Sequence, residues 1–544
     1  QAAQAGVLTS IELQLLQQLL DQLLTASQPA LVTVQLCCQH LQNPLHFDKL
    51  QKLLQPYQPV LHLLALGFAA AATCANTVGG TDNSAEGKVA QYQAGMDAAI
   101  AMLLSNEPHA VSHFVDSQLH SDVLQGFGGD GRERYIGYLS AEKRFHGAFT
   151  LLSLLPMTPE QRYYEAKLRS HNTELDYTLR LGFSAEAPFK VSTISLNYRT
   201  AAADKALARL SQQQVVSELA GYIDRLAGRG LFSGTVLLAD RQGVLYQTAK
   251  GMADLRYQVK NNTDTKFNLA SMNKMFTAVS VLQLVAEKKL ALDDKLIKYL
   301  DRELFAAGDF DNITIAQLLT HTAGLGWSNY PDMSQNKLRN LNDHRPFLKH
   351  LPLNSPPGSR FSYSNEGMLL LGMVIEAVSG KSYDDYVQQH IYAKAGMPNS
   401  GNFDIDGVTP NMAMGYFYSQ QLQSMQTNWF IAGIKGSPAG GGYSTINDLY
   451  QFATALTQYQ LLPKALTEAA YSAKPELNSA WYGYGFSVRT NSHGRVVGHS
   501  GDFIGVSSAM RIYLDKGFTL VVLANQSFAS EPVVNKADLL LQQL

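Results

Sequence analysis

The sequence predicts an α+β protein in which an antiparallel sheet is flanked by helices and a mainly helical lobe is inserted into the chain. Strand patterns occur near both ends of the segment 201–544, and helical patterns fill the stretch between them. We therefore expect strands from the two ends to share one sheet, with the active cleft between sheet and lobe. Further strand patterns within 81–200 predict a small α+β module that precedes this main domain.

The bulk composition is that of a globular protein. The chain has 544 residues, of which 46% are hydrophobic and 16% charged, with a formal net charge of −2. This length predicts two or three domains, which we place at 1–80, 81–200 and 201–544. A near-neutral charge gives no reason to expect nucleic acid or an anionic membrane surface as a partner.

The segment 1–80 differs from the rest of the chain. It has a Leu- and Gln-rich helix pattern at 10–26 and an apolar, Ala-rich run at 60–75. The run is too short and interrupted for a stable membrane span. It suits the apolar part of an export signal, which predicts a periplasmic or secreted protein. The alternative is a buried helix in a cytoplasmic protein, and the role of residues 1–75 stays open.

Cysteine usage excludes several kinds of site from the main body. Cys37, Cys38 and Cys74 are the three cysteines of the chain, and all lie in the first 80 residues. The rest of the sequence therefore has no disulfide, no thiolate metal site and no cysteine nucleophile. No spaced set of His, Asp and Glu has the form of a metal site, and we expect neither a metal nor a cofactor.

The 81–200 module follows a Gly- and Asn-rich linker at 77–87. Two helices and four strands are expected in it, at 89–104, 109–125, 145–155, 163–169, 174–182 and 189–197. This order of elements loosely resembles the modules similar to nuclear transport factor 2. The module is expected to mediate self-association or to shield the cleft.

The main domain begins with a helical stretch at 202–228. Two strands follow at 234–239 and 244–250, paired around a turn, and a strongly apolar helix is expected at 271–288. Later elements are a helix at 368–378 and strands at 486–489, 496–498, 507–513 and 518–524.

Ser271-Met-Asn-Lys274 begins the apolar helix of this domain. Residues three apart share one face of a helix, so the lysine can reach the serine oxygen. A serine hydroxyl is a weak nucleophile until a neighbouring base takes its proton, and a desolvated lysine can be that base. The same spacing occurs at Ser140 with Lys143 and at 334–337, but neither pair precedes an apolar helix, so we interpret both as surface pairs.

Two further motifs are unique in the chain. Tyr363-Ser-Asn365 is its one Tyr-x-Asn, and His499-Ser-Gly501 is its one His-x-Gly. The first leads into the helix at 368–378. The second is expected where a strand ends, with the glycine allowing a substrate to approach the backbone closely.

Together these motifs resemble the penicillin-recognising serine hydrolases. Additional stretches agree with the family pattern, namely Leu318 to Leu325, Tyr363 to Gly372 and Ser437 to Ser444. The resemblance extends over about 234–525, and it implies a fold similar to class C β-lactamases. In pattern the chain is most similar to the β-lactamase-like carboxylesterases of family VIII.

The resemblance implies a role for each matching position. Ser271 would attack a carbonyl and form an acyl-enzyme, and Lys274 and Tyr363 would share base and acid duty. Which of the two is the base stays open. Asn365 would bind a substrate carbonyl or hold Lys274. The backbone N–H groups of Ser271 and Asp502 would form the oxyanion hole.

The third motif departs from the family pattern. Where β-lactamases usually have Lys-Thr-Gly, this chain has His499, Ser500 and Gly501 as substrate-binding positions. Histidine is largely neutral at pH 7, so a substrate carboxylate would lack its usual cation. The expected partner is a small-molecule ester or amide, with a carboxylic ester favoured. The alternatives are β-lactamase, D-Ala-D-Ala carboxypeptidase or D-aminopeptidase activity, and a non-catalytic binding protein.

Several other residues admit a structural interpretation. His321, in a Thr-His-Thr-Ala-Gly turn, is expected to bond to the backbone rather than to catalyse. The triple glycine 440–442 lacks the residues of a phosphate loop and is expected to let backbone pack near the cleft. Four aromatic residues are expected either to line an acyl pocket or to belong to the core: Trp429, Tyr443, Trp481 and Tyr484.

Overall fold

The computed structural model describes residues 84–125, 131–158, 160–161, 163–198, 208–305, 310–326, 338–349, 351–419, 421–431, 433–491 and 494–544. The predictions for residues 10–26 and 60–75, the cysteines and the Ser-x-x-Lys pattern at 334–337 lie outside these residues. The chain divides into two compact units. The first runs to Ile136 and also takes Ala148–Arg169 and Tyr177–Asn197, and the second takes the intervening segments and Tyr198–Leu544.

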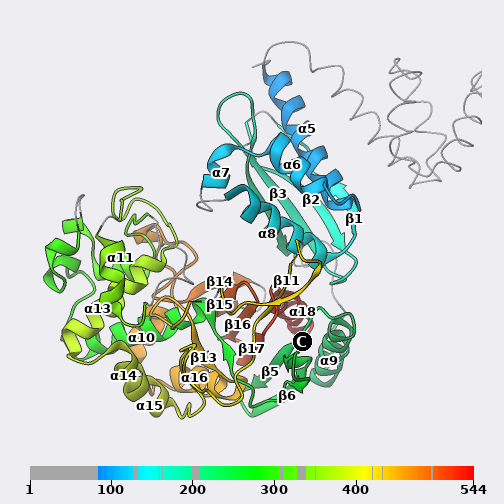
Figure 1. Cartoon of the computed structure of the whole chain (residues 1–544). Coiled ribbons are helices and arrows are strands. Elements are labelled where there is room, and N and C mark those ends of the chain that lie inside the picture. Colours follow the sequence, from blue (N-terminus) through cyan, green and yellow to red (C-terminus); the bar gives the residue numbers. More distant parts are fainter. Residues whose placement is uncertain are drawn as a thin grey trace, which may run out of the picture. The chain divides into compact units, whose positions relative to one another are not determined.

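Helices and a four-stranded sheet form the N-terminal elements (Figure 1). The sheet has the order β1-β2-β3-β4. Helix α5 begins at Ala85, inside the expected linker, because the Ser84 side chain caps it by accepting a hydrogen bond from Gly87 N. Helix α8 was not predicted. The bounds are α5 Ala85–Leu104, α6 Ala110–Gln118, α7 Ser121–Gln125, α8 Gly131–His146, β1 Phe149–Leu154, β2 Tyr163–Ser170, β3 Asp176–Phe183 and β4 Val191–Tyr198.

The second unit is built on a six-stranded antiparallel sheet with the order β14-β15-β16-β17-β5-β6. Strand β5, near the start of this unit, pairs with β17, near the end of the chain, with Val236 opposite Val522. Figure 1 shows the green β5 beside the red β17. The prediction that strands from both ends share one sheet is confirmed. The bounds are β5 Gly234–Asp240, β6 Gly243–Lys250, β14 Ser487–Asn491, β15 Gly494–Phe503, β16 Val506–Tyr513 and β17 Phe518–Ala524.

Alternate residues of β16 show what covers each face of the sheet. The hydroxyls of Ser507 and Tyr513 bond to Ser530 and Asp538 of helix α18 (Ser530–Leu541). Ser508, which points the other way, donates from Oγ to Leu269 O at 2.8 Å. Helix α9 (Gln212–Gly228), with a Ser211–Gln214 capping box, packs against α18. One face therefore meets the terminal helices, and the other meets the chain around Ser271.

A mainly helical lobe lies between β9 and β14 in the sequence. Its centre is α10, where almost every side chain is buried because the helix is surrounded by core. The helices are α10 Asn273–Ala286, α11 Ile315–Leu319, α12 Arg345–Leu348, α13 Asn365–Ser379, α14 Tyr383–Val387, α15 Ala393–Ala395, α16 Ile446–Thr457 and α17 Lys464–Ala470. Short strands accompany them: β7 Met252–Asp254, β8 Val259–Lys260, β9 Phe267–Asn268, β10 Gly401–Asn402, β11 Tyr416–Ser419, β12 Ser424–Thr427 and β13 Gly442–Ser444.

The described residues contain neither a helix suited to a membrane nor a cluster suited to a metal ion. Within them, no helix combines the length and the apolar character that crossing a membrane requires. The same residues contain no group of three or more His, Cys, Asp or Glu side chains arranged to hold a metal ion.

Candidate active site

Ser271 lies in a 3-10 turn, Ala270–Met272, that leads directly into α10. The sequence predicted that the serine begins the α-helix. The serine instead lies in the 3-10 turn that precedes it, and α10 begins at Asn273. Ala270 has a φ of +44°, a left-handed conformation that is costly for a residue with a side chain. The chain bends sharply there between β9 and α10, and a 3-10 turn is a common way to begin a helix after such a bend.

Lys274 reaches the serine, as the spacing predicts. Its Nζ lies 3.1 Å from Ser271 Oγ, 2.8 Å from Asn365 Oδ1 and 2.5 Å from Ala439 O. The side chain is fully buried, so these three groups form its polar surroundings. Burial lowers the pKa of Lys274 from 10.5 to about 7, and the nearby Glu366 carboxylate acts in the opposite direction. A large fraction of this lysine is thus neutral at physiological pH.

The loop 437–442 lies against the first turns of α10. Three consecutive carbonyl oxygens of the loop accept hydrogen bonds from α10 side chains: Ser437 O from Asn273, Pro438 O from Thr277 and Ala439 O from Lys274. The glycines allow this packing, since a Cβ at Gly442 would lie 2.2 Å from Asn273 Oδ1. The loop therefore fixes the position of the lysine.

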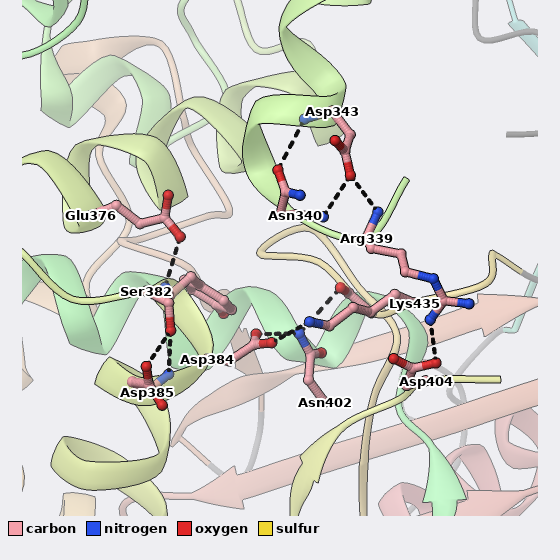
Figure 2. A network of polar contacts seen from close by, with 12 residues as sticks. Arg339, Asn340, Asp343, Glu376, Ser382, Asp384, Asp385, Asn402, Asp404 and Lys435 are labelled. Carbon is pink, nitrogen blue, oxygen red and sulfur yellow. Dashed lines mark hydrogen bonds and ion pairs between the residues drawn. The ribbon is translucent and has the colours of Figure 1, made fainter. Parts of the chain in front are cut away.

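A polar network supports the start of this loop (Figure 2). Asp384 accepts hydrogen bonds from Lys435 Nζ at 2.8 Å and from Asn402 Nδ2 at 2.6 Å. Asn402 Nδ2 also donates to Gly436 O at 3.1 Å, immediately before the loop. Arg339 forms ion pairs with Asp404 and Asp406 in the same network. Asp384 thus links helix α14 to the segment that leads into the loop.

Tyr363 lies beside the lysine, just before helix α13. The Lys274 Nζ is 4.8 Å from the centre of its ring. Burial raises the pKa of Tyr363 to about 12, and a side-chain hydrogen bond with Ser271 opposes this rise. His321 packs on the Tyr363 ring with centroids 4.4 Å apart, and its Nδ1 accepts a hydrogen bond from Ser364 N at 3.1 Å. His321 therefore supports the tyrosine segment through a backbone contact.

His499 lies within β15 rather than at the end of a strand, so that expectation is wrong: β15 continues to Phe503 because it pairs with β16 up to Val506. The imidazole is buried, with Nδ1 2.5 Å from Ser500 O and Nε2 2.9 Å from the Tyr482 hydroxyl. A carbonyl can only accept, so Nδ1 donates and Nε2 accepts from tyrosine. This pattern is that of a neutral ring, and burial lowers the pKa of His499 to about 3.

The rest of the third motif passes close to the nucleophile. A Cβ at Gly501 would lie 2.0 Å from Leu269 O and 2.9 Å from Ser271 N, so only glycine fits. Asp502, the next residue of β15, pairs with Ser507, whose Oγ donates to its carboxylate at 2.9 Å. Ser500 Oγ accepts a hydrogen bond from the buried Arg511 guanidinium at 2.8 Å.

Three contributors to the site were not predicted from the sequence: Ala439 O, Tyr482 and Arg511. Ala439 precedes the triple glycine, which was expected to let backbone pack near the cleft, but no contact of Ala439 O with Lys274 was predicted. Tyr482 and Arg511 belong to no recognisable motif. The tertiary fold places them against His499 and Ser500, respectively. Arg511 faces Gly498 across the β15–β16 ladder, which no local pattern reveals.

The assembled groups have a definite chemical capacity. A serine hydroxyl lies within hydrogen-bonding distance of an amine that can accept its proton near neutral pH. The protonated Tyr363 lies beside both groups. The backbone at Gly501 lies close to Ser271 N. This combination can form and break an acyl-serine bond.

Comparisons with known proteins agree with this chemistry. The Beta-lactamase family model matches residues 219–544. Penicillin-binding protein 4* of Bacillus subtilis is 31% identical over 330 residues, which cover 57% of this chain and 71% of that protein. Protein flp of Staphylococcus aureus is 27% identical, over 58% of this chain and 63% of its own length.

Solved structures show the same likeness. A penicillin-binding protein from Bacillus halodurans matches with a TM-score of 0.53 and 29% identity, over 60% of this chain and 98% of that one. An octameric penicillin-binding protein homologue from Pyrococcus abyssi matches with a TM-score of 0.51 and 26% identity, over 59% and 76% of the two chains. On this evidence the chain belongs to the Beta-lactamase family, the serine hydrolases that include penicillin-binding protein homologues.

Proposed function

We propose that this protein hydrolyses neutral carboxylic esters through an acyl-serine intermediate. Ser271 Oγ attacks the ester carbonyl while Lys274 Nζ takes its proton. The backbone N–H groups of Ser271 and Asp502 stabilise the oxyanion, and Tyr363 passes a proton to the leaving alcohol and is reprotonated by Lys274. Water then attacks the acyl-serine and gives one proton to Lys274. That proton passes to Ser271 Oγ as the acid is released. Asn365 keeps Lys274 in place, since its Oδ1 accepts a hydrogen bond from Lys274 Nζ.

The pairing of Ser271 with a buried lysine is the observation on which the proposal rests. The two side chains are 3.1 Å apart, and the pKa of Lys274 is about 7. A base is most effective when its pKa is near the working pH. The pKa of Tyr363 is about 12, so its hydroxyl holds its proton at neutral pH. These values favour Lys274 as the base and leave Tyr363 as the proton donor.

The neutral His499 supports an ester as the substrate. The ring is buried, its two nitrogens are engaged by Ser500 O and the Tyr482 hydroxyl, and its pKa is about 3. It supplies no positive charge for a substrate carboxylate at physiological pH. An uncharged ester needs no such charge.

One observation favours a second candidate, a substrate with a carboxylate such as a β-lactam or a peptide terminus. The Arg511 guanidinium lies 2.8 Å from Ser500 Oγ, within the third motif. The names of the relatives point the same way, since two of them are penicillin-binding proteins and a third is a homologue of one. Against this candidate, Arg511 is buried and also donates to Met510 O.

A side-by-side assay separates the two candidates. The purified protein is given p-nitrophenyl butyrate, nitrocefin and a D-Ala-D-Ala peptide under the same conditions. We expect turnover of the ester to exceed that of the other two, because only the ester lacks a carboxylate that requires a cation. Faster turnover of nitrocefin or the peptide would contradict the ester proposal and favour a role for Arg511.

Replacing Asp384 by asparagine is expected to lower kcat for the ester by about 10- to 100-fold, because small displacements of catalytic groups have effects of this size. The change removes the ion pair with Lys435 and weakens support for the loop whose Ala439 O holds Lys274. KM should change by less than about threefold, since Asp384 acts through the loop and not on substrate. Steady-state kinetics measure the two parameters.

Asp406→Asn is the matched control for this prediction. Asp406 belongs to the same network but pairs with Arg339, away from the loop. It should retain wild-type kcat, and thermal denaturation of both variants shows whether either loses stability. Equal losses of kcat in the two variants would contradict a specific positioning role for Asp384.

A further inference from the structure

Exposed apolar side chains gather on three loops of the second unit. One is the β7–β8 turn, another follows β12, and the third is the turn between β15 and β16. We call this surface the apolar rim. Its side chains and their exposed fractions are Leu255 37%, Tyr257 77%, Trp429 41%, Phe430 81%, Phe503 37% and Ile504 42%.

Two contacts bring the three loops together. Asn428 Nδ2 donates to Ile504 O at 2.9 Å, which joins the loop after β12 to the β15–β16 turn. The Arg256 guanidinium lies 5.0 Å from the centre of the Trp429 ring, which joins the β7–β8 turn to the same loop. These contacts join the three loops that carry the six side chains, whereas apolar residues scattered singly would need no explanation.

The apolar rim begins beside the nucleophile. Gly501 packs against Ser271 N, and Phe503 follows it by two residues on the same strand. A strand rises about 3.3 Å per residue, so the rim starts roughly 7 Å from the glycine. A group attached to the ester carbonyl and directed along β15 would reach the rim directly.

The charges on the rim are already paired. Arg256, the cation of the β7–β8 turn, bonds to Asp254 at 3.2 Å. Lys435, further along the loop after β12, bonds to Asp384 at 2.8 Å. A charged substrate portion would find no free counter-charge there, whereas an apolar chain would remove the exposed aromatic and aliphatic surface from water.

We infer that the apolar rim binds the acyl chain of the ester, which makes medium- and long-chain esters, of about six to ten carbons, the substrate class. This inference rests on the proposed ester hydrolysis and specifies it. Each fully buried methylene contributes about fourfold to binding, equivalent to about 0.8 kcal/mol. Because the apolar rim is open to solvent on one side, we expect each methylene of the acyl chain to increase kcat/KM by about twofold.

The test is a series of p-nitrophenyl esters from acetate to decanoate, each below its micelle concentration. In the wild-type protein, kcat/KM should rise with chain length, giving an octanoate-to-acetate ratio of at least about tenfold. Phe430→Ser should reduce this ratio severalfold, because it removes an apolar partner of the chain. Phe430 is 81% exposed, so its replacement leaves the core intact.

Val408→Ser is the matched control, since Val408 is 97% exposed and lies outside the rim. It should show the wild-type chain-length profile. A flat profile in the wild-type protein that hydrolyses acetate well would overturn the inference while leaving ester hydrolysis in place. Absence of turnover for every ester would overturn both. A change of mass on light scattering in Phe430→Ser, with an unchanged ester profile, would instead assign the rim to contact between copies of this chain.

Discussion

Ser271→Ala is expected to lower kcat/KM for p-nitrophenyl butyrate by about 10⁴-fold or more, the size of effect seen when a covalent nucleophile is removed. The variant should retain the fold, because alanine differs from serine only by the missing hydroxyl group. It should also fail to react with a covalent serine probe, since no oxygen remains to be acylated. Mass spectrometry of the intact protein after exposure to the probe measures this directly.

Ser140→Ala provides the control for the nucleophile. Ser140 and Lys143 have the same sequence spacing in helix α8, without the contacts that surround Ser271. This variant should keep wild-type activity and labelling. If Ser271→Ala retained normal turnover, the acyl-serine mechanism would be wrong.

Lys274→Met is expected to lower kcat/KM by about 10³-fold, because a general base typically contributes 10²–10⁴-fold. The wild-type protein should show an acidic limb in its pH–rate profile near pH 7, the pKa of Lys274. Below that pH the lysine is protonated and cannot accept the serine proton, so activity falls about tenfold per pH unit. The limb should disappear in Lys274→Met.

The pH profile also distinguishes the two candidate bases. If Tyr363 were the base, activity would continue to rise towards pH 12, the pKa of its hydroxyl. A plateau above pH 8 agrees with Lys274 alone. His499 does not contribute to the limb near pH 7, because its pKa of about 3 lies well below the pH at which that limb is expected. Lys143→Met is the matched control and should leave both the rate and the limb unchanged.

The sequence was informative where chemistry depends on local spacing. Ser271 and Lys274 are one helical turn apart, so their contact follows from helix geometry, and the structure shows it at 3.1 Å. Strand patterns likewise predicted the shared sheet, because the apolar runs of β5 and β17 are visible in short windows. The left-handed Ala270 was not predictable, since nothing in its side chain favours that conformation.

Groups brought in by long-range pairing escaped prediction. Arg511 reaches Ser500 through the register of β15 and β16, and Tyr482 reaches His499 from a separate loop. The continuation of β15 beyond His499 was missed for the same reason, because a strand's length depends on its partner as well as on its own residues. Tyr363 and His499 were assigned through resemblance to a family, and their sequence neighbourhoods alone would not have shown that they meet.

The order of strands in the six-stranded sheet has a consequence for how the chain is made. Ser508 contacts Leu269, 239 residues earlier, and β5 is completed by β17. A ribosome adding about 5–20 residues per second leaves β5 and the apolar α10 without their partners for roughly 10–50 s. During this interval the apolar surfaces of β5 and α10 are open to aggregation. Premature termination before β16 would leave an inactive fragment with an exposed apolar strand, a natural target for chaperones and proteases.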